Sequence, residues 1–409
     1  MNYKKKDRLY AIAYQILNVV GSSLFVGYLV SLISYEGYGL WVSVNGVCLL
    51  ISSFLFSGIG NASGRFIASV KEIRELQSLL NIISKYIFRS LVYLIILTFL
   101  LCCISIIYHK IYLHYIFLIL VYVTFYGLNS VLRNICTVDN KRNIVFYAKF
   151  AEFIVKFSLL FYIQKNSINL NVTYILILIN ISFFVSFIIF LLTTKYKFNF
   201  KEKTSKKLTK SFNSFSKPFY VQSLINWVRD WSDKYILLFV VGPKILGEWS
   251  IYQQLIVTPL ILISSTSISV IYPTIYKEYD KFKKSNYLNK SIKYLLILVP
   301  IIFILSNIFD NIIIYIFENY LNKEISNDLP IILVVLLGLI SLFLPWIDLV
   351  FLLKNKTKKL TSYKLILLMV NSLSLILVLF YPSLYFLLII SIISKLISII
   401  IGYKWQQQL

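Results

Sequence analysis

The sequence predicts an all-α integral membrane protein with about twelve transmembrane helices in two six-helix bundles. The chain of 409 residues is 58% hydrophobic and has a mean hydropathy of +0.77, which is more apolar surface than a soluble domain covers. Its apolar segments reach the roughly 20 residues that a membrane-spanning helix needs. Most of its 41 Lys and Arg residues fall in one alternating set of loops, as the positive-inside rule describes.

The other set of loops has only four basic residues: Lys110, Lys165, Lys244 and Lys323. The expected spans are residues 9–34, 40–62, 82–108, 111–132, 144–163, 172–194, 218–241, 249–276, 292–315, 330–353, 361–381 and 383–403. An even number of spans places both termini on the basic, cytoplasmic side of the membrane. The first span is too long for a signal peptide, so we expect it to stay uncleaved.

A weak internal repeat suggests how these spans are grouped. The predicted parts are a six-helix half over residues 1–194, a basic cytoplasmic linker over 195–217 and a second six-helix half over 218–409. Gly39 and Trp41, after the first span, recur as Gly247 and Trp249, 208 residues later in both cases. Six spans per half give both halves the same orientation. Such parallel repeats are typical of secondary transporters, whose substrate site lies between the repeats.

Composition also excludes several classes of protein. The formal net charge of +24 would suggest nucleic-acid binding in a soluble protein, but here the basic loops face anionic headgroups. We therefore expect membrane lipids, and no nucleic acid, as partners. The sequence shows no metal-ligand cluster and no nucleotide-binding loop, so we expect no metal and no cofactor. The four cysteines lie in or beside apolar segments and are interpreted as small hydrophobic residues: Cys48, Cys102, Cys103 and Cys136.

Charged residues occur near the middle of the seventh span, where each costs roughly 2.5–3.5 kcal/mol if it faces lipid. They are Arg229, Asp230, Asp233 and Lys234. One interpretation is internal neutralisation, in which Arg229 pairs with Asp233, and Asp230 with Lys234, at i,i+4 spacing. The other is that these groups line a path through the membrane. We favour the path, because ionisable residues inside a membrane are usually functional.

The fifth span carries Lys149, Glu152 and Lys156 on one helix face. One carboxylate cannot neutralise two ammonium groups, so a positive charge remains on that face. Lys156 is the deeper of the two lysines and the better functional candidate. Near the membrane surface, Lys85, Arg89 and Lys395 are expected to extend to the inner headgroups instead.

Polar residues at helical spacing add to the prediction of a hydrated interior. The first span has Tyr14, Gln15, Asn18 and Ser22 on one side. Small polar residues often pack helices together in membranes, so this stripe supports the hydrated interior only together with the charged spans. Asp348, in the tenth span, is expected either to pair with a basic residue or to carry a coupling proton.

Several short motifs resemble those of Wzx-type polysaccharide and O-antigen flippases, in the multidrug/oligosaccharidyl-lipid/polysaccharide exporter superfamily. The residues that carry the resemblance are Glu36-Gly37-Tyr38-Gly39-Leu40-Trp41, Gly58-Ile59-Gly60-Asn61-Ala62, Arg65, Asp230, Asp233 and Gly242. The two-bundle arrangement of twelve spans matches along the full length. Where such families have a Leu-Gly-Pro turn after the first span, this chain has Ile33-Ser34-Tyr35.

The resemblance implies a non-enzymatic flippase of the bacterial plasma (inner) membrane. Its substrate would be an undecaprenyl-diphosphate-linked oligosaccharide, the repeat unit of O-antigen or capsule, and its other partners polymerase and chain-length proteins of the same pathway. The expected substrate-binding cavity contains Arg65, Lys149, Lys156, Arg229, Lys234, Asn18 and Gln15. The expected ion-coupling residues are Glu152, Asp230, Asp233 and Asp348. Basic groups there would hold the diphosphate by charge-assisted hydrogen bonds.

Two alternatives stay open from sequence. A membrane polysaccharide polymerase or glycosyltransferase would need a large outer loop with catalytic groups, whereas the outer loops here are short. A multidrug exporter of the same superfamily would favour an acidic cavity for cationic substrates, whereas the charged spans here carry a basic excess.

Overall fold

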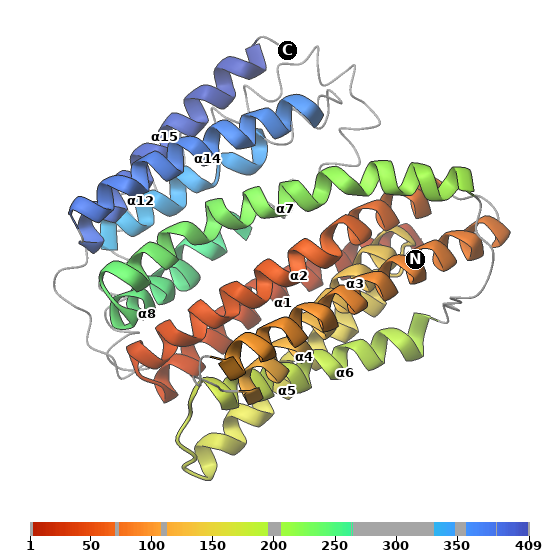
Figure 1. Ribbon diagram of the computed structural model, residues 1–409, viewed down its shortest axis with the longest axis horizontal. Coiled ribbons are helices and arrows are strands. Elements are labelled where there is room, and N and C mark those ends of the chain that lie inside the picture. The colour runs from red at the N-terminus through yellow and green to blue at the C-terminus, as the bar shows by residue number, and fades with distance from the viewer. Residues whose placement is uncertain are drawn as a thin grey trace. The chain divides into compact units, whose positions relative to one another are not determined.

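The computed structural model describes residues 3–69, 73–107, 113–194, 206–262, 264, 331–347, 357–381 and 383–407. These residues form helices and short connections, and no strand occurs among them (Figure 1). The helices are α1 (Tyr3–Leu32), α2 (Tyr35–Ser69), α3 (Ile73–Ile107), α4 (Leu113–Val138), α5 (Arg142–Lys165), α6 (Val172–Thr194), α7 (Lys206–Val240), α8 (Pro243–Tyr252), the π-helix η1 (Gln253–Val257), α12 (Ile331–Ser341), α14 (Thr357–Phe380) and α15 (Leu384–Gln407).

Seven of the described helices are long and apolar enough to cross a membrane. Their apolar stretches are Leu9–Leu32, Tyr35–Ile67, Glu75–Cys103, Leu113–Val138, Val172–Thr194, Ser362–Phe380 and Leu384–Gly402. Helices α5 and α7 are as long but carry charged residues in their middle turns. The chain is therefore a multi-pass membrane protein of the predicted all-α class. The predicted ninth span, residues 292–315, lies outside the described residues.

Helix α7 begins at Lys206, about three turns before the predicted start at Pro218. Its lysine-rich first turns resemble a loop by hydropathy, but they pack through aromatic residues. Phe212 is fully buried, and its ring centre lies 5.6 Å from that of Phe66 and 5.1 Å from that of Tyr86. Burial of such a ring stabilises a helix whose intrinsic propensity is modest.

The contacts divide the chain into two compact units. The first unit comprises residues 1–18 and 44–227, and the second comprises residues 19–43 and 228–409. Helices α1, α2 and α7 therefore contribute to both units. This division describes packing rather than repetition, and the predicted division of the sequence at residues 195–217 stays a prediction.

In the first unit, α4, α5 and α6 form the most densely packed group. Its apolar core consists of Leu132, Cys136, Ile144, Val145, Ala148 and Phe190. Two asparagines on this group donate to backbone carbonyls of a neighbouring helix: Asn129 to Phe183, at 2.9 Å, and Asn180 to Leu118, at 3.0 Å. Such bonds fix the rotation of α4 against α6, because an amide in an apolar environment needs a partner.

In the second unit, α14 and α15 pack side by side, and α12 packs against α15 (Figure 1). Tyr363 on α14 is almost fully buried, and its hydroxyl donates to the Ser398 carbonyl of α15 at 3.0 Å. The π-helix η1 follows α8 and contacts α12. A π-helical turn widens the helix locally and often marks a functional position.

Gly127 on α4 allows α2 to approach α4 closely, and we expect its substitution to destabilise the protein. A Cβ at this position would overlap the ring of Phe56, which is 2% exposed and cannot move aside. Overpacking of this kind costs about 1–3 kcal/mol. Thermal unfolding of the detergent-purified Gly127→Ala variant should therefore begin at a lower temperature than that of the wild type. Gly64→Ala is the control, because its Cβ would meet only Val138, at an ordinary 3.4 Å; equal losses in both variants would contradict the packing argument.

Candidate functional site

The first unit contains a cluster of ionisable residues on α5. Lys149, Glu152 and Lys156 lie on one face of the helix, as their spacing predicted. The Lys149 Nζ lies 2.8 Å and the Lys156 Nζ 2.6 Å from the same carboxylate oxygen, Oε1 of Glu152. Glu152 is 5% exposed and Lys156 8% exposed. One buried carboxylate is thus shared by two ammonium groups.

Aromatic rings help to accommodate these two cations. The Lys149 Nζ lies 4.7 Å from the centre of the Phe153 ring. The Lys156 Nζ lies 5.5 Å from the same ring and 5.1 Å from the ring of Phe183 on α6. Contacts between an ammonium group and the face of a ring are attractive, and more so where water is excluded. The rings therefore stabilise the positive charge that the single Glu152 carboxylate does not neutralise.

A third basic residue, Arg133, lies beside this cluster, and sequence reasoning missed it as a site residue. The predicted fourth span ends at residue 132, which places Arg133 in the loop that follows it. In the structure α4 continues to Val138, and the Arg133 Nη1 donates to the Tyr14 hydroxyl of α1 at 3.2 Å. The signal was present in the sequence, since α4 carries polar residues at helical spacing: Tyr126, Asn129, Ser130 and Arg133.

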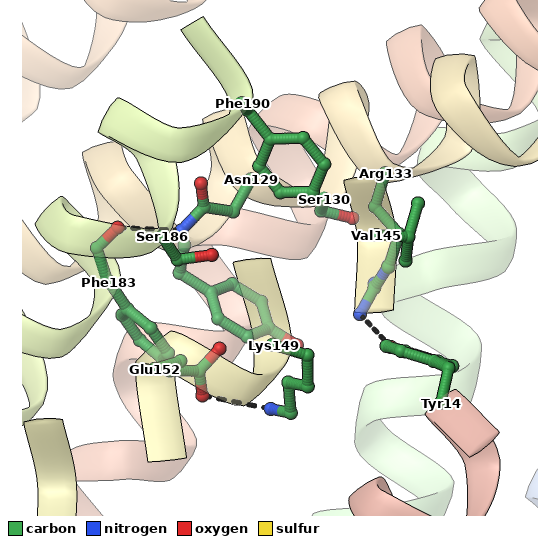
Figure 2. Close-up of a pocket in the computed structure, with 11 residues that line it drawn as sticks. Tyr14, Asn129, Ser130, Arg133, Val145, Lys149, Glu152, Phe183, Ser186 and Phe190 are labelled. Atoms are coloured by element: carbon green, nitrogen blue, oxygen red, sulfur yellow. Dashed lines mark hydrogen bonds and ion pairs between the residues drawn. The ribbon is translucent and has the colours of Figure 1, made fainter. Parts of the chain in front are cut away.

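These side chains meet at a pocket between α1, α4, α5 and α6 (Figure 2). The cavity itself is small, about 50 Å³, and is open on one side. It is lined by Tyr14, Tyr126, Asn129, Ser130, Arg133, Val145, Lys149, Glu152, Phe183, Ser186 and Phe190. Figure 2 shows Lys149 and Glu152 joined on one side of the space and Arg133 joined to Tyr14 on the other.

The charge balance of this cluster is positive. Among the residues that line the pocket, Arg133 and Lys149 are basic and Glu152 is acidic, which leaves an excess of one positive charge. Lys156, which contacts Glu152 but does not line the pocket, adds a second. Hydroxyl and amide groups of Ser130, Ser186 and Asn129 complete a polar wall. A pocket of this composition is suited to an anion with hydrogen-bonding oxygens, because charge-assisted hydrogen bonds to such oxygens are the strong ones.

The second unit holds the other predicted cluster, on α7, and the ion pairs differ from those expected. Arg229 pairs with its neighbour Asp230, with Nε 2.8 Å and Nη2 3.2 Å from the two carboxylate oxygens. The Lys234 Nζ donates to the Asp230 backbone carbonyl at 3.0 Å and lies 4.7 Å from the Trp231 ring centre. The predicted i,i+4 pairs are therefore wrong. The long Arg229 side chain reaches the adjacent carboxylate with two of its three guanidinium nitrogens, a favourable geometry.

One carboxylate oxygen of Asp233 accepts from the Lys234 backbone N–H of its own helix at 2.9 Å, and the other faces a neighbouring helix. This second oxygen accepts from Trp249 Nε1 at 3.3 Å and from Gln253 Nε2, in the π-helical turn, at 3.1 Å. Lys395 on α15 lies within electrostatic reach of Asp233 and Asp230. It donates to the Ser341 hydroxyl at 2.7 Å rather than extending to the headgroups as expected. Neutral donors thus hold this carboxylate, with a cation nearby.

The remaining predicted site residues do not line the pocket of the first unit. Arg65 lies at the end of α2, where its guanidinium carbon is 4.4 Å from the centre of the Phe215 ring. Gln15 and Asn18 are half-buried on α1; Gln15 directly follows Tyr14, which lines the pocket, and Asn18 lies about one turn after Tyr14. Asp348 lies outside the described residues. The roles assigned to these four residues stay predictions.

Comparison with solved structures identifies the class of fold. An inward-facing multidrug resistance transporter of the MATE family, in the MOP superfamily, matches with a TM-score of 0.67 at 15% identity, over 98% of this chain and 97% of that one. A MOP superfamily transporter from Pyrococcus furiosus, described as having a binding pocket of reverse polarity, matches with a TM-score of 0.65 at 15% identity, over 98% and 93%. The chain therefore has the two-bundle fold of MATE transporters, as the sequence predicted.

The family follows from the sequence itself. A model of the family described as polysaccharide biosynthesis protein matches residues 5–279, which is more than half of the chain. The chain belongs to this family, in agreement with the resemblance found in its motifs. No curated protein matches it.

Glu152 is expected to be required for the stability of the α5 cluster. Its replacement by Gln leaves two buried ammonium groups without their shared carboxylate, and breaking a buried ion pair costs roughly 3–5 kcal/mol. Glu152→Gln should lower the unfolding temperature, and adding Lys156→Met should restore much of the loss, because one of the two stranded charges is then removed. The measurement is thermal unfolding in detergent of the two single variants and the double variant. Additive effects would show that the shared carboxylate does not couple these residues.

Proposed function

We propose that this protein is a flippase that moves an undecaprenyl-diphosphate-linked oligosaccharide from the inner to the outer leaflet of a bacterial plasma membrane. Family membership supports a role in polysaccharide biosynthesis, and the fold is that of membrane transporters. The observation that carries the proposal is the excess of positive charge at the pocket of the first unit. Together with Lys156 on the far side of Glu152, it balances the two negative charges of a diphosphate that is esterified at both ends.

The pocket residues suggest how the diphosphate would be held. Arg133 presents a planar fork of donors, which suits phosphate oxygens. Lys149 would donate to a phosphate oxygen in place of part of its contact with Glu152, and Lys156, which does not line the pocket, would keep its contact with Glu152. The hydroxyl and amide groups of Asn129, Ser130 and Ser186 would then bind the remaining oxygens or the first sugar. The lipid tail would stay in the bilayer throughout.

The same exchange of partners offers a route to coupling. When a phosphate oxygen takes over the Lys149 ammonium group, the Glu152 carboxylate loses one of its two counter-ions and takes up a proton more readily. Asp230, Asp233 and Asp348 remain further proposed coupling residues. In this mechanism the two halves rock about the substrate and expose it to one side of the membrane at a time.

The positive charge of the pocket also argues against multidrug export. Cationic, apolar drugs need an acidic or neutral cavity, and the excess of two positive charges at Arg133, Lys149, Lys156 and Glu152 would repel them. The MATE likeness at 15% identity therefore supports the fold of an exporter and not its drug specificity.

We expect removal of the Arg133 charge to abolish export. The test is complementation of a strain of the native host from which this gene is deleted. There, Arg133→Gln should fail to restore the cell-envelope glycan, and the lipid-linked intermediate should accumulate on the inner leaflet. Arg133→Lys should retain part of the activity, since it keeps the charge but loses the planar fork.

The control for that experiment is Lys85→Gln, a loss of one positive charge from α3 outside the pocket. Immunoblots should show equal amounts of all variants in the membrane. Full export by Arg133→Gln, at normal protein levels, would overturn the proposed role of the pocket.

A further inference from the structure

The first turns of α2 and α8 touch through glycine, within the second unit. A Cβ on Gly39 would overlap the Pro243 carbonyl oxygen and lie 2.9 Å from the Gly247 nitrogen. A Cβ on Gly247 would overlap the Tyr35 carbonyl oxygen and lie 3.0 Å from the Gly39 nitrogen. Each glycine therefore packs against the backbone of the other helix, and neither position has room for a side chain.

The contact is reciprocal. Tyr35 is the first residue of α2 and Pro243 the first residue of α8, and Gly39 and Gly247 each stand four residues further on. The two helices thus begin, and touch, at equivalent positions of the repeat detected in the sequence. In a two-fold symmetric contact, residue i of one element meets residue j of the other, and j meets i. The contact is therefore two-fold symmetric in its residues, and its two sides are the equivalent positions of the repeat.

The chemistry of the contact explains why glycine is required. Where other residues carry Cβ, glycine has a hydrogen, and here that hydrogen points at a carbonyl oxygen of the facing helix. Cα–H to carbonyl contacts of this type recur where small residues let two membrane helices approach closely. Large buried residues surround the pair: Tyr38 and Trp41 on α2, and Leu246 and Trp249 on α8. The helices cannot shift by a few tenths of an ångström without disturbing this packing.

The same contact continues one turn deeper into the membrane. The Tyr235 hydroxyl of α7 donates to the Ser43 carbonyl of α2 at 2.8 Å. Trp249, two residues after Gly247, donates to Asp233 of α7 at 3.3 Å. The start of α2 and the start of α8 are therefore tied to the end of α7. By the distribution of basic residues, all three lie on the outer side of the membrane.

We infer that Gly39 and Gly247 are positioning residues for transport, forming the contact that closes the outer side of the protein between release events. This inference rests on the proposed function, because a flippase must close its outer side while it loads substrate from the inner leaflet. The backbone contact has to separate when the outer side opens and has to form again afterwards. A side chain at either position prevents it from forming, so that the outer side stays open.

Access to Ser43 tests this inference. Ser43 lies one helical turn after Gly39, on the same face of α2, and is half-buried. Ser43→Cys is introduced into a variant whose four native cysteines are replaced by Ala, and intact cells are treated with a membrane-impermeant maleimide. Gly39→Ala and Gly247→Ala should each increase the labelling rate on the order of tenfold, and Gly64→Ala, on the same helix, should leave it unchanged.

The double variant Gly39→Ala/Gly247→Ala separates closure from general loosening of the fold. One separation of the helices relieves both overlaps, so the double variant should label little faster than either single variant. Rates that multiply, or rates equal to that of the parent in both single variants, would overturn the inference. Glycan export is measured in parallel. If the glycine variants label faster as expected but Arg133→Gln exports normally, the inference about closure stands and only the proposed substrate site is wrong.

Discussion

A single buried carboxylate shared by two ammonium groups is the interaction on which the rest of this account depends. Glu152 holds Lys149 and Lys156 through one oxygen atom, at 2.8 and 2.6 Å. Charges in this environment are costly unless they are paired, so α5 has to face protein rather than lipid. That constraint fixes the rotation of α5 and turns its polar face toward α4 and α6. It also leaves a positive excess, to which Arg133 adds a further charge.

In the proposed cycle, the pocket of the first unit and the contact between α2 and α8 have different tasks. The pocket in the first unit is lined by long charged side chains, Arg133, Lys149 and Glu152, which in the proposal exchange a carboxylate for a phosphate without repacking. The contact between α2 and α8 is built from backbone and has no alternative geometry. A transporter needs both properties, since its substrate must be released easily while its closed state must be well defined. In this chain the two are carried by different residues, which makes them separable by mutation.

The sequence predicted more of the fold than of the site. Hydropathy and the basic loops gave the helical class, and spacing along one helix gave the group of Lys149, Glu152 and Lys156. Spacing could not give partners on other helices: Asp233 was assigned to Arg229, whereas it binds Trp249 of α8. Arg133 was missed because hydropathy ends a span where the polar residues begin, although α4 continues to Val138. The repeat of Gly39 in Gly247 was visible, but its meaning depends on contact across two helices.

Binding of a diphosphate lipid to the purified protein is the most direct test of the central claim. Farnesyl diphosphate and farnesol are titrated against the wild type and the Arg133→Gln/Lys156→Met variant, with thermal stabilisation as the readout. We expect farnesyl diphosphate to stabilise the wild type, to lose most of this effect in the variant and in high salt, and to act far more strongly than farnesol. Equal stabilisation by the two lipids, or an unchanged effect in the variant, would contradict the account.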